Sequence, residues 1–342
     1  MVYEPYQEEL PANKAKAWSL LKSYSKIPPN EIESHLRAVR EKARKVFPYG
    51  CIGRWLFLDY AITTLPEYPS IVQRIKSGDI LLDAGCAFGY VLRQLASDGA
   101  PAANLMGTDI EQRFMDLGYE LFKDRGMFVA RFFAGDLLEL EGHSLDEVDG
   151  KVSIIHAAGL FHLFEWDDQV KLGIRLVEFF KPDVKNPMLI GRQIGDFHPL
   201  DPATHAEQGL GWYRHNIETW QQLWDRIGEE TGTKWKATGS LPEIPRSAIG
   251  ADAPRAGFDF TVSPSHETDT APTRLCRRAI HAPHAARFPG TVQSEETERM
   301  ELAKMPRWPT AFSGCLQTHS PVSVRQSRTV ASRQADTRSN EW

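Results

Sequence analysis

Short apolar runs that alternate with amphipathic stretches constrain the fold of this chain more than any other feature of its sequence. The runs have the length and the flanking turn residues of β-strands. They lie at Ile80–Ala84, Asn104–Thr108, Arg131–Ala134, Val152–His156, Met188–Arg192, Lys234–Thr238 and 257–264. Helices are predicted at Tyr90–Asp98, Gln112–Phe122, Asp167–Phe180 and Ile217–Gly228. Strands joined through helices form right-handed crossovers, so the sequence predicts an α/β, doubly wound fold with a mostly parallel seven-stranded sheet.

The segments on either side of residues 79–264 differ from this pattern. Residues 1–78 predict a helical N-terminal cap or lid, since "PPNEIESHLRAVREKARKVF" carries apolar residues at helical spacing. Residues 265–342 contain 1 Lys and 10 Arg, whereas the preceding part has 14 Lys and 15 Arg. This tail also lacks apolar periodicity, which indicates either a disordered segment or the product of a retained intron or shifted reading frame. In the second case the alternative is a degenerate protein that folds poorly, or that binds its ligands without catalysing a reaction.

Composition excludes several classes of function. The 342 residues carry a formal net charge of −5, so no basic excess points to nucleic acid or to an anionic membrane surface. No apolar run is long enough to span a membrane, and the N-terminus lacks the pattern of a signal peptide. The four cysteines are scattered without a C-x-x-C pair, which predicts a reduced, cytoplasmic protein with no cysteine metal site.

The stretch "DILLDAGCAFGYVLRQL" (residues 79–95) predicts a strand, a glycine turn and a helix at a ligand site. Asp83 ends the strand, and Gly85 and Gly89 flank a turn where a Cβ would push a ligand away. A dinucleotide site needs G-x-G-x-x-G, but Ala87 replaces the middle glycine and the third is missing. This departure disfavours an NAD-dependent oxidoreductase, the alternative class of enzyme. D-x-G-x-x-x-G is instead motif I of class I S-adenosylmethionine methyltransferases.

Two further acids at strand ends favour an adenosine ligand. Asp109 ends its strand 24 residues after Gly85, near the interval of about 20 residues at which an acid meets ribose hydroxyls. Asp136 follows the next strand, where it can accept from an adenine amino group while Leu137 offers its backbone. Each acid alone has the simpler interpretation of a helix cap or loop carboxylate. Three successive strand ends share one edge of a parallel sheet, so together they predict one site.

At this point the chain resembles the fungal class I methyltransferases of secondary-metabolite pathways, particularly those that methylate meroterpenoid intermediates. The resemblance covers residues 25 to 240. It is carried by "KARKVFPYGCIGRWLFLD", "LLDAGCAFGYVLRQLASDGAP", "LMGTDIEQRFMDLGYELFKDR", "AGLFHLFEWDDQ" and "WYRHNIETWQQLWDRIGEETGTKW". It implies a Rossmann-like fold, S-adenosylmethionine as cofactor, a role in terpenoid or polyketide biosynthesis, and a homodimer. It also places the cofactor contacts at Asp83, Asp109 with Ile110, and Asp136 with Leu137.

The methyl acceptor is expected to be a hydrophobic small molecule, bound near "HAAGLFHLFEW" after the fourth strand. His162 is the candidate catalytic residue, as general base or to orient the acceptor; the alternative is a histidine bonded beneath the next helix. A carboxyl acceptor is preferred because a carboxylate is already a nucleophile, and methylation of a hydroxyl is the runner-up. Arg192, Arg214 and His215 are candidate ligands for that carboxylate. The alternative is that they form surface salt bridges, which is the preferred interpretation for Arg214.

Two groups of aromatic residues have competing interpretations. Trp55 and Phe57 are expected to cover the cofactor as part of the lid, whereas Phe161, Phe164 and Trp166 either line the acceptor cavity or pack the following helix on the sheet. Packing is the preferred interpretation for the second group.

Overall fold

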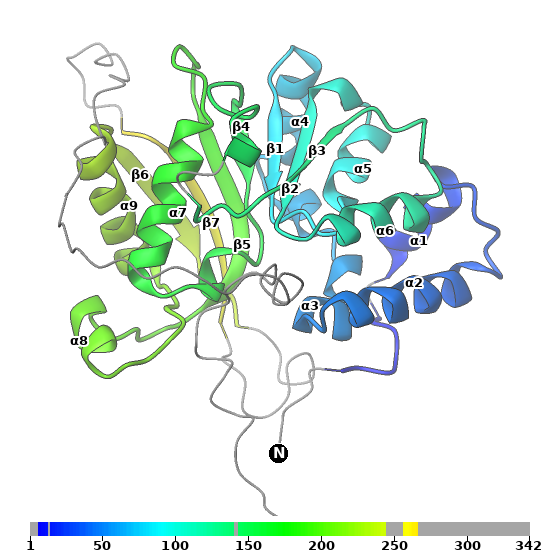
Figure 1. The fold of residues 1–342 in the computed structure, drawn as a ribbon, viewed down its shortest axis with the longest axis horizontal. Coiled ribbons are helices and arrows are strands. Elements are labelled where there is room, and N and C mark those ends of the chain that lie inside the picture. Colours follow the sequence, from blue (N-terminus) through cyan, green and yellow to red (C-terminus); the bar gives the residue numbers. More distant parts are fainter. Residues whose placement is uncertain (1–5, 13, 140–142, 244–255, 266–342) are drawn as a thin grey trace, which may run out of the picture. The chain divides into compact units, whose positions relative to one another are not determined.

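The computed structural model describes residues 6–12, 14–139, 143–243 and 256–265. Its centre is a seven-stranded sheet in the order β3-β2-β1-β4-β5-β7-β6, in which only β7 runs antiparallel to its neighbours (Figure 1). The strands are β1 Leu81–Ala84, β2 Leu105–Asp109, β3 Arg131–Ala134, β4 Ile154–His156, β5 Met188–Gly195, β6 Trp235–Ser240 and β7 Ala256–Pro264. The predicted fold class is confirmed.

Helices connect the strands and cover both faces of the sheet (Figure 1). The α-helices are α1 Ala15–Ser23, α2 Ile32–Val46, α3 Gly50–Gly53, α4 Tyr68–Lys76, α5 Tyr90–Ser97, α6 Gln112–Phe122, α7 Trp166–Glu178, α8 Pro202–Glu207 and α9 Ile217–Thr231. Short 3₁₀ turns are η1 Leu56–Leu58, η2 Ala61–Thr64, η3 Ala102–Asn104, η4 His143–Leu145 and η5 Phe161–Leu163. The predicted helices are present, with ends that differ by a few residues.

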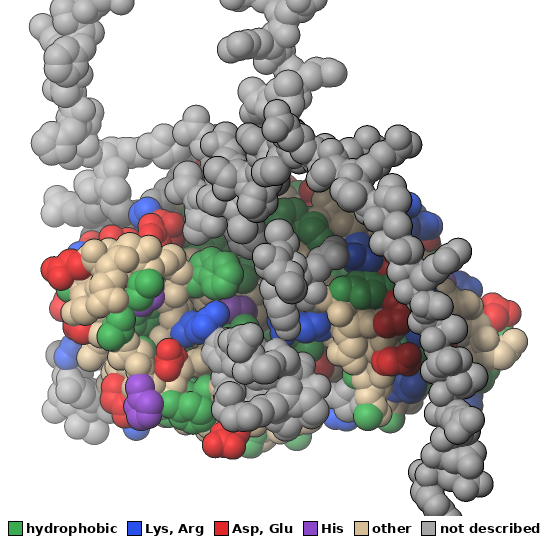
Figure 2. Space-filling view, turned by 90° about the horizontal axis from the view of Figure 1, so that it is seen from below, with side chains coloured by type: hydrophobic (Ala, Val, Ile, Leu, Met, Phe, Trp, Pro, Cys, Tyr) green, Lys and Arg blue, Asp and Glu red, His purple; other side chains and the backbone are tan. Residues whose placement is uncertain are grey.

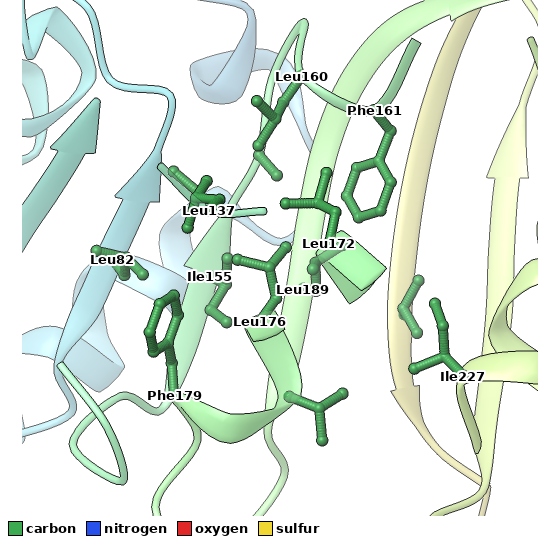
Figure 3. Close-up of a cluster of buried hydrophobic side chains, with 14 of the residues drawn as sticks. Leu82, Leu137, Ile155, Leu160, Phe161, Leu172, Leu176, Phe179, Leu189 and Ile227 are labelled. Carbon is green, nitrogen blue, oxygen red and sulfur yellow. The ribbon is translucent and has the colours of Figure 1, made fainter. Parts of the chain in front are cut away.

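Alternation along each strand divides the sheet's apolar side chains between two cores. Leu81 and Leu105 pack with α4 and α5 on one face. Leu82 and Met106 pack with α7 and α9 on the other, where the side chains of the larger cluster point toward one another (Figure 3). Because side chains of successive strand residues point to opposite faces, β1, β2, β4 and β5 each contribute buried side chains to both cores, whereas β6 and β7 contribute to the second core alone. Both faces of the sheet are therefore covered, as a mainly parallel sheet requires.

The N-terminal helices pack on α6 and on the turn after β1. The amphipathic helix α2 buries Ile32, Leu36, Val39 and Ala43 against Phe114 and Leu121 of α6. Within the predicted cap at residues 1–78, α4 packs directly on the sheet, so the segment is structurally continuous with the α/β core. The role of residues 1–78 as a lid stays a prediction. The prediction for residues 265–342 lies outside the described residues, apart from Ser265.

Candidate active site

The carboxyl ends of β1 to β5 meet at one edge of the sheet, where parallel folds bind their ligands. Figure 2 views the molecule from that side and shows Lys or Arg side chains beside a His side chain in the middle of the face. The segments at this edge are the turn at residues 85–89, Asp109–Ile110, Gly135–Leu137, and residues 157–163 with η5. Sequence analysis placed every candidate cofactor residue in the first three of these segments except Asp83, which lies in β1.

The glycine turn after β1 is shaped by its own packing. Gly85 and Gly89 have φ angles of +73° and +61°, in the left-handed region that glycine adopts without strain. A Cβ on Gly85 would lie 3.3 Å from Leu160, and one on Gly89 would lie 2.7 Å from the guanidinium of Arg93 and 2.8 Å from Phe132. The space beside Gly89 is therefore filled by Arg93 and Phe132, and a role of Gly85 and Gly89 in cofactor binding stays a prediction.

Asp109 holds the turn and faces the edge of the sheet. One carboxylate oxygen accepts from the backbone N–H of Ala87 at 2.8 Å, and the other accepts from the N–H of Glu111 at 3.1 Å. Burial raises the pKa of Asp109 to about 6, against the lowering effect of these two hydrogen bonds. The carboxylate is thus short of hydrogen-bond donors, although each oxygen keeps acceptor capacity.

The segments after β2 and β3 supply an apolar and an acidic side chain next to Asp109. Ile110 is 36% exposed, a large apolar side chain that its own fold leaves partly uncovered. Asp136 accepts from the backbone N–H of Leu138 at 2.9 Å, and Leu137 is buried in the core. The structure therefore brings Asp109, Ile110 and Asp136 to one edge, while Leu137 anchors its segment from below.

Asp83 differs from the other two acids. It is buried in β1, directly opposite His156 of β4, and its carboxylate lies 2.7 Å from Nδ1 of that histidine. Sequence analysis did not anticipate this partner. The pair joins the two central strands at the edge of the sheet. The Asp83 carboxylate therefore holds His156 in place, in addition to its predicted role as a cofactor contact.

A second buried pair, which sequence analysis missed, supports the turn from behind. Arg93 of α5 makes two hydrogen bonds with Asp124, and its Nη1 donates to the carbonyl of Phe88 at 3.0 Å. Tyr24, which directly follows α1, donates to the same aspartate at 2.8 Å. The network links the N-terminal helices to the glycine turn. An arginine on the apolar face of α5 was the available signal, since a fully buried arginine needs partners.

His162 in η5 has an unusual environment at this edge. Its Nδ1 is buried and has no hydrogen-bond partner among the described residues. Burial and, to a smaller extent, the positive charges of Arg214 and Arg54 together lower the pKa of His162 to about 3. The imidazole is therefore neutral at physiological pH, and it lies near two arginines that come from distant parts of the chain.

Two of the three predicted carboxylate ligands have partners of their own. Arg192 of β5 forms an ion pair with Asp259, its register partner on β7. His215 is fully buried, with its ring nitrogens bonded to Gln169 at 2.9 Å and to Thr219 at 3.2 Å. Both expectations are wrong, because each residue is used to join neighbouring elements of the fold.

The aromatic residues that were expected to serve the site belong to two different hydrophobic clusters. Phe161 is fully buried against Trp220, with ring centroids 5.0 Å apart, and Phe164 and Trp166 pack on the same core. The packing interpretation of these residues is confirmed. Trp55 and Phe57 are buried as well, and the ring centroids of Phe57 and of Phe88 in the glycine turn lie 5.0 Å apart.

Cys86 within the turn is buried, and burial raises the pKa of its thiol well above the usual value, which keeps it neutral and unreactive. Among the described side chains, no three His, Cys, Asp or Glu residues gather as ligands for a metal ion. No helix of the described part is long and apolar enough to cross a membrane.

The strand order, the single antiparallel strand β7 and the glycine turn beside an acid at the end of β2 define a class I S-adenosylmethionine-dependent methyltransferase. Comparison with known proteins narrows this class. Residues 5–58 match the meroterpenoid methyltransferase N-terminal domain, and residues 81–183 match the methyltransferase domain. The chain belongs to the fungal meroterpenoid methyltransferases.

Curated relatives support this assignment over most of their length. The chain is 36% identical to methyltransferase adrK of Penicillium roqueforti over 231 residues, which cover 68% of this chain and 82% of that one. It is 38% identical to the asnovolin E/chermesin D methyltransferase nvfJ of Aspergillus novofumigatus, with 64% and 78% covered. A solved methyltransferase from Methanosarcina mazei aligns at 15% identity, a TM-score of 0.42, and coverage of 59% and 100%. Methyl transfer, and not the NAD-dependent oxidation considered as the alternative, is the reaction of the family.

Proposed function

We propose that this protein methylates a carboxyl group of a hydrophobic small molecule, with S-adenosylmethionine as the methyl donor. Membership of the family gives the cofactor and the reaction class. The choice of a carboxyl over a hydroxyl acceptor rests on the environment of His162, the only ionisable candidate for a base that sequence analysis placed at this edge.

The described residues fit the cofactor at the ends of β1 to β3. The Asp109 carboxylate, which burial leaves short of donors, suits the two hydroxyls of a ribose. The partly exposed side chain of Ile110 suits one face of a purine, and Asp136 suits its amino group. In this arrangement Asp83 keeps His156 in place, and the backbone of the turn that begins at Gly85 approaches the remaining part of the cofactor.

A neutral, buried His162 with a pKa of about 3 is a weak base. General-base catalysis is most effective when the pKa of the base lies near the working pH. A hydroxyl acceptor would have to lose its proton to such a base, whereas a carboxylate is ionised beforehand and needs only to be positioned. The nearby charges of Arg54 and Arg214, which disfavour a protonated imidazole, would also favour a negatively charged acceptor.

When it is bound, S-adenosylmethionine supplies an electrophilic methyl group: an acceptor oxygen forms the new C–O bond, the C–S bond breaks, and its electron pair stays on sulfur. The protein's own task is then to hold the acceptor in line and to keep water out. His162 orients the acceptor by a hydrogen bond and moves no proton. Phe161 and the core beneath it hold the η5 turn rigid, which keeps the imidazole at a fixed distance from the acceptor.

The test uses the full chain, methyl-labelled S-adenosylmethionine, and a set of apolar carboxylic acids with the corresponding alcohols. Mild base releases a methyl ester's label as methanol but leaves a methyl ether intact, so the two products are distinguished directly. We expect labelled, base-labile product from the acids alone. Base-stable product from the alcohols would refute the carboxyl assignment, and protein that binds S-adenosylhomocysteine but transfers no methyl group would favour a degenerate enzyme.

The homodimer implied by the resemblance stays a prediction, as does the cytoplasmic location. Sedimentation of the full chain at several concentrations tests the first of these, because a dimer of useful affinity shows a mass twice that of the 38.6 kDa chain.

A further inference from the structure

Arg54 and Arg214 reach the edge of the sheet from opposite ends of the sequence. Arg54 lies between α3 and η1, and Arg214 lies in the segment that joins α8 to α9. Both positive charges act on the imidazole of His162 in η5, so the three side chains share one neighbourhood.

The three side chains have in common a buried nitrogen without a partner. Nε of Arg54, Nε of Arg214 and Nδ1 of His162 are all shielded from solvent and make no hydrogen bond within the described residues. Among the other buried or half-buried arginines, Arg93 is paired with Asp124 and Arg192 with Asp259. Nε of Arg40 and Nη2 of Arg74 also lack a hydrogen-bond partner in the described part of the chain, although the Arg40 guanidinium lies over the Trp55 ring. A guanidinium nitrogen that is shielded from solvent and has no acceptor is costly, and an anionic ligand would remove that cost. The charge of Asp196 acts on Arg214, but Nε of Arg214 makes no hydrogen bond with it.

The backbone around both arginines is held firmly by its neighbours. Tyr213 donates its N–H to the carbonyl of Phe164 at 2.9 Å, which ties the Arg214 segment to the end of η5. On the other side, the buried Trp55 donates its indole N–H to the carbonyl of Gln7 at 3.0 Å. Each arginine therefore follows or precedes a buried aromatic residue, and this fixes where its side chain starts. Such preorganisation lowers the entropic cost of ordering the two arginine side chains when a ligand binds.

Large apolar side chains flank the same two segments. Their exposed fractions are 45% for Leu56 next to Arg54, and 44% for Trp212 beside Arg214. Phe197, Leu200 and Leu210, on the segment that leads to Trp212, are 42%, 42% and 43% exposed. The guanidinium of Arg214 lies 5.9 Å from the centre of the Trp212 ring. A positive site thus borders an apolar surface.

We propose that Arg54 and Arg214 are specificity-determining residues that hold the carboxylate of an amphipathic acceptor, while Leu56 and Trp212 contact its hydrocarbon body. This inference rests on the proposed function and names the groups that select the acceptor. A carboxylate has two oxygens with about four acceptor sites, so one oxygen can be held while the other receives the methyl group. An alcohol cannot satisfy two guanidinium groups in this way, and the clamp discriminates against it.

The test measures binding of a simple amphipathic acid, decanoate, to the full chain saturated with S-adenosylhomocysteine, with decan-1-ol as the neutral counterpart. Phenylglyoxal, which modifies accessible arginines, reports on each guanidinium by peptide mapping. We expect decanoate to bind and to slow modification of Arg54 and Arg214, and decan-1-ol to do neither. The variants are Arg54→Met and Arg214→Met, with Arg226→Met as the matched control, since Arg226 is an exposed arginine paired with Glu229 and Glu230 on α9.

Each clamp variant should weaken decanoate binding by about ten- to a hundredfold, the effect of losing one charge-assisted hydrogen bond. Arg226→Met should leave it unchanged. Equal binding of decanoate to all variants, equal protection by decan-1-ol, or no binding of decanoate would each overturn the proposal. Calorimetric titration of the unchanged protein and of the same variants with S-adenosylhomocysteine separates the two claims. If the unchanged protein does not bind S-adenosylhomocysteine, the proposed function is refuted. If the variants bind both S-adenosylhomocysteine and decanoate as well as the unchanged protein does, only the clamp is refuted.

Discussion

Cofactor affinity should depend on the ionisation of Asp109. Burial raises the pKa of Asp109 to about 6. Around it, burial raises the pKa of the Tyr49 phenol, and raises that of the Cys51 thiol to about 11, so both stay neutral between pH 5 and 8. The hydrogen bond with Arg113 lowers the pKa of Glu111, which stays ionised. Of these four groups, Asp109 is the one whose charge changes in this range.

The expected magnitude follows from the ionised fraction. At pH 5, one unit below a pKa of about 6, only about one carboxylate in eleven is charged, whereas at pH 8 nearly all are. If ribose hydroxyls donate to the ionised form, the affinity for S-adenosylhomocysteine should be about tenfold weaker at pH 5 than at pH 8. Calorimetric titrations across this range measure it, and they should also record proton release from the protein on binding near pH 6.

Asp109→Asn is the matched control because it keeps the shape of the side chain but removes the titration. Its affinity should be lower than that of the unchanged protein at pH 8 and should vary little with pH. The sign for stability is the reverse: a raised carboxyl pKa means that ionisation works against folding, so without cofactor the protein should lose up to about 3 kcal/mol between pH 4 and 7 at this group. A flat pH dependence of affinity, or one that persists in Asp109→Asn, would refute the reasoning.

Three further predictions concern the turn, its support and His162. Gly89→Ala should destabilise by about 1–3 kcal/mol more than Gly209→Ala in urea unfolding, because both glycines have φ near +60° but only Gly89 has neighbours within 3 Å of a new Cβ. Equal losses would show that the close packing is unimportant. Arg93→Met should cost about 3–5 kcal/mol by leaving a buried carboxylate unpaired, and adding Asp124→Leu should recover much of it; an unrecovered loss would mean that the contact with the Phe88 carbonyl dominates. His162→Gln should lower kcat by less than about a hundredfold, with no inflection of the rate near neutral pH in the unchanged protein; a larger loss with such an inflection would identify a general base.

The sequence alone determined the features that depend on local spacing. Apolar runs of strand length, separated by amphipathic helices, specify a doubly wound sheet, because backbone hydrogen bonding and burial leave few other arrangements for them. The glycine turn and the acids at the ends of β2 and β3 follow from the same logic, since consecutive parallel strands end at one edge. Asp109 and Asp136 were found in this way, and both lie at that edge.

The tertiary structure decided which polar side chains were already used. His162 and His215 look alike in sequence, each between aromatic residues, but only folding shows that Gln169 and Thr219 satisfy His215 and that His162 keeps an unpaired nitrogen. Arg192 and Arg214 can likewise be told apart only in the folded protein, because β7 brings Asp259 beside β5, where it forms an ion pair with Arg192. Arg54 and Arg214 both act on the His162 imidazole only because distant segments converge, and no local pattern carries that information. Long-range contacts are set by packing and charge between elements, not by the spacing of residues along one of them.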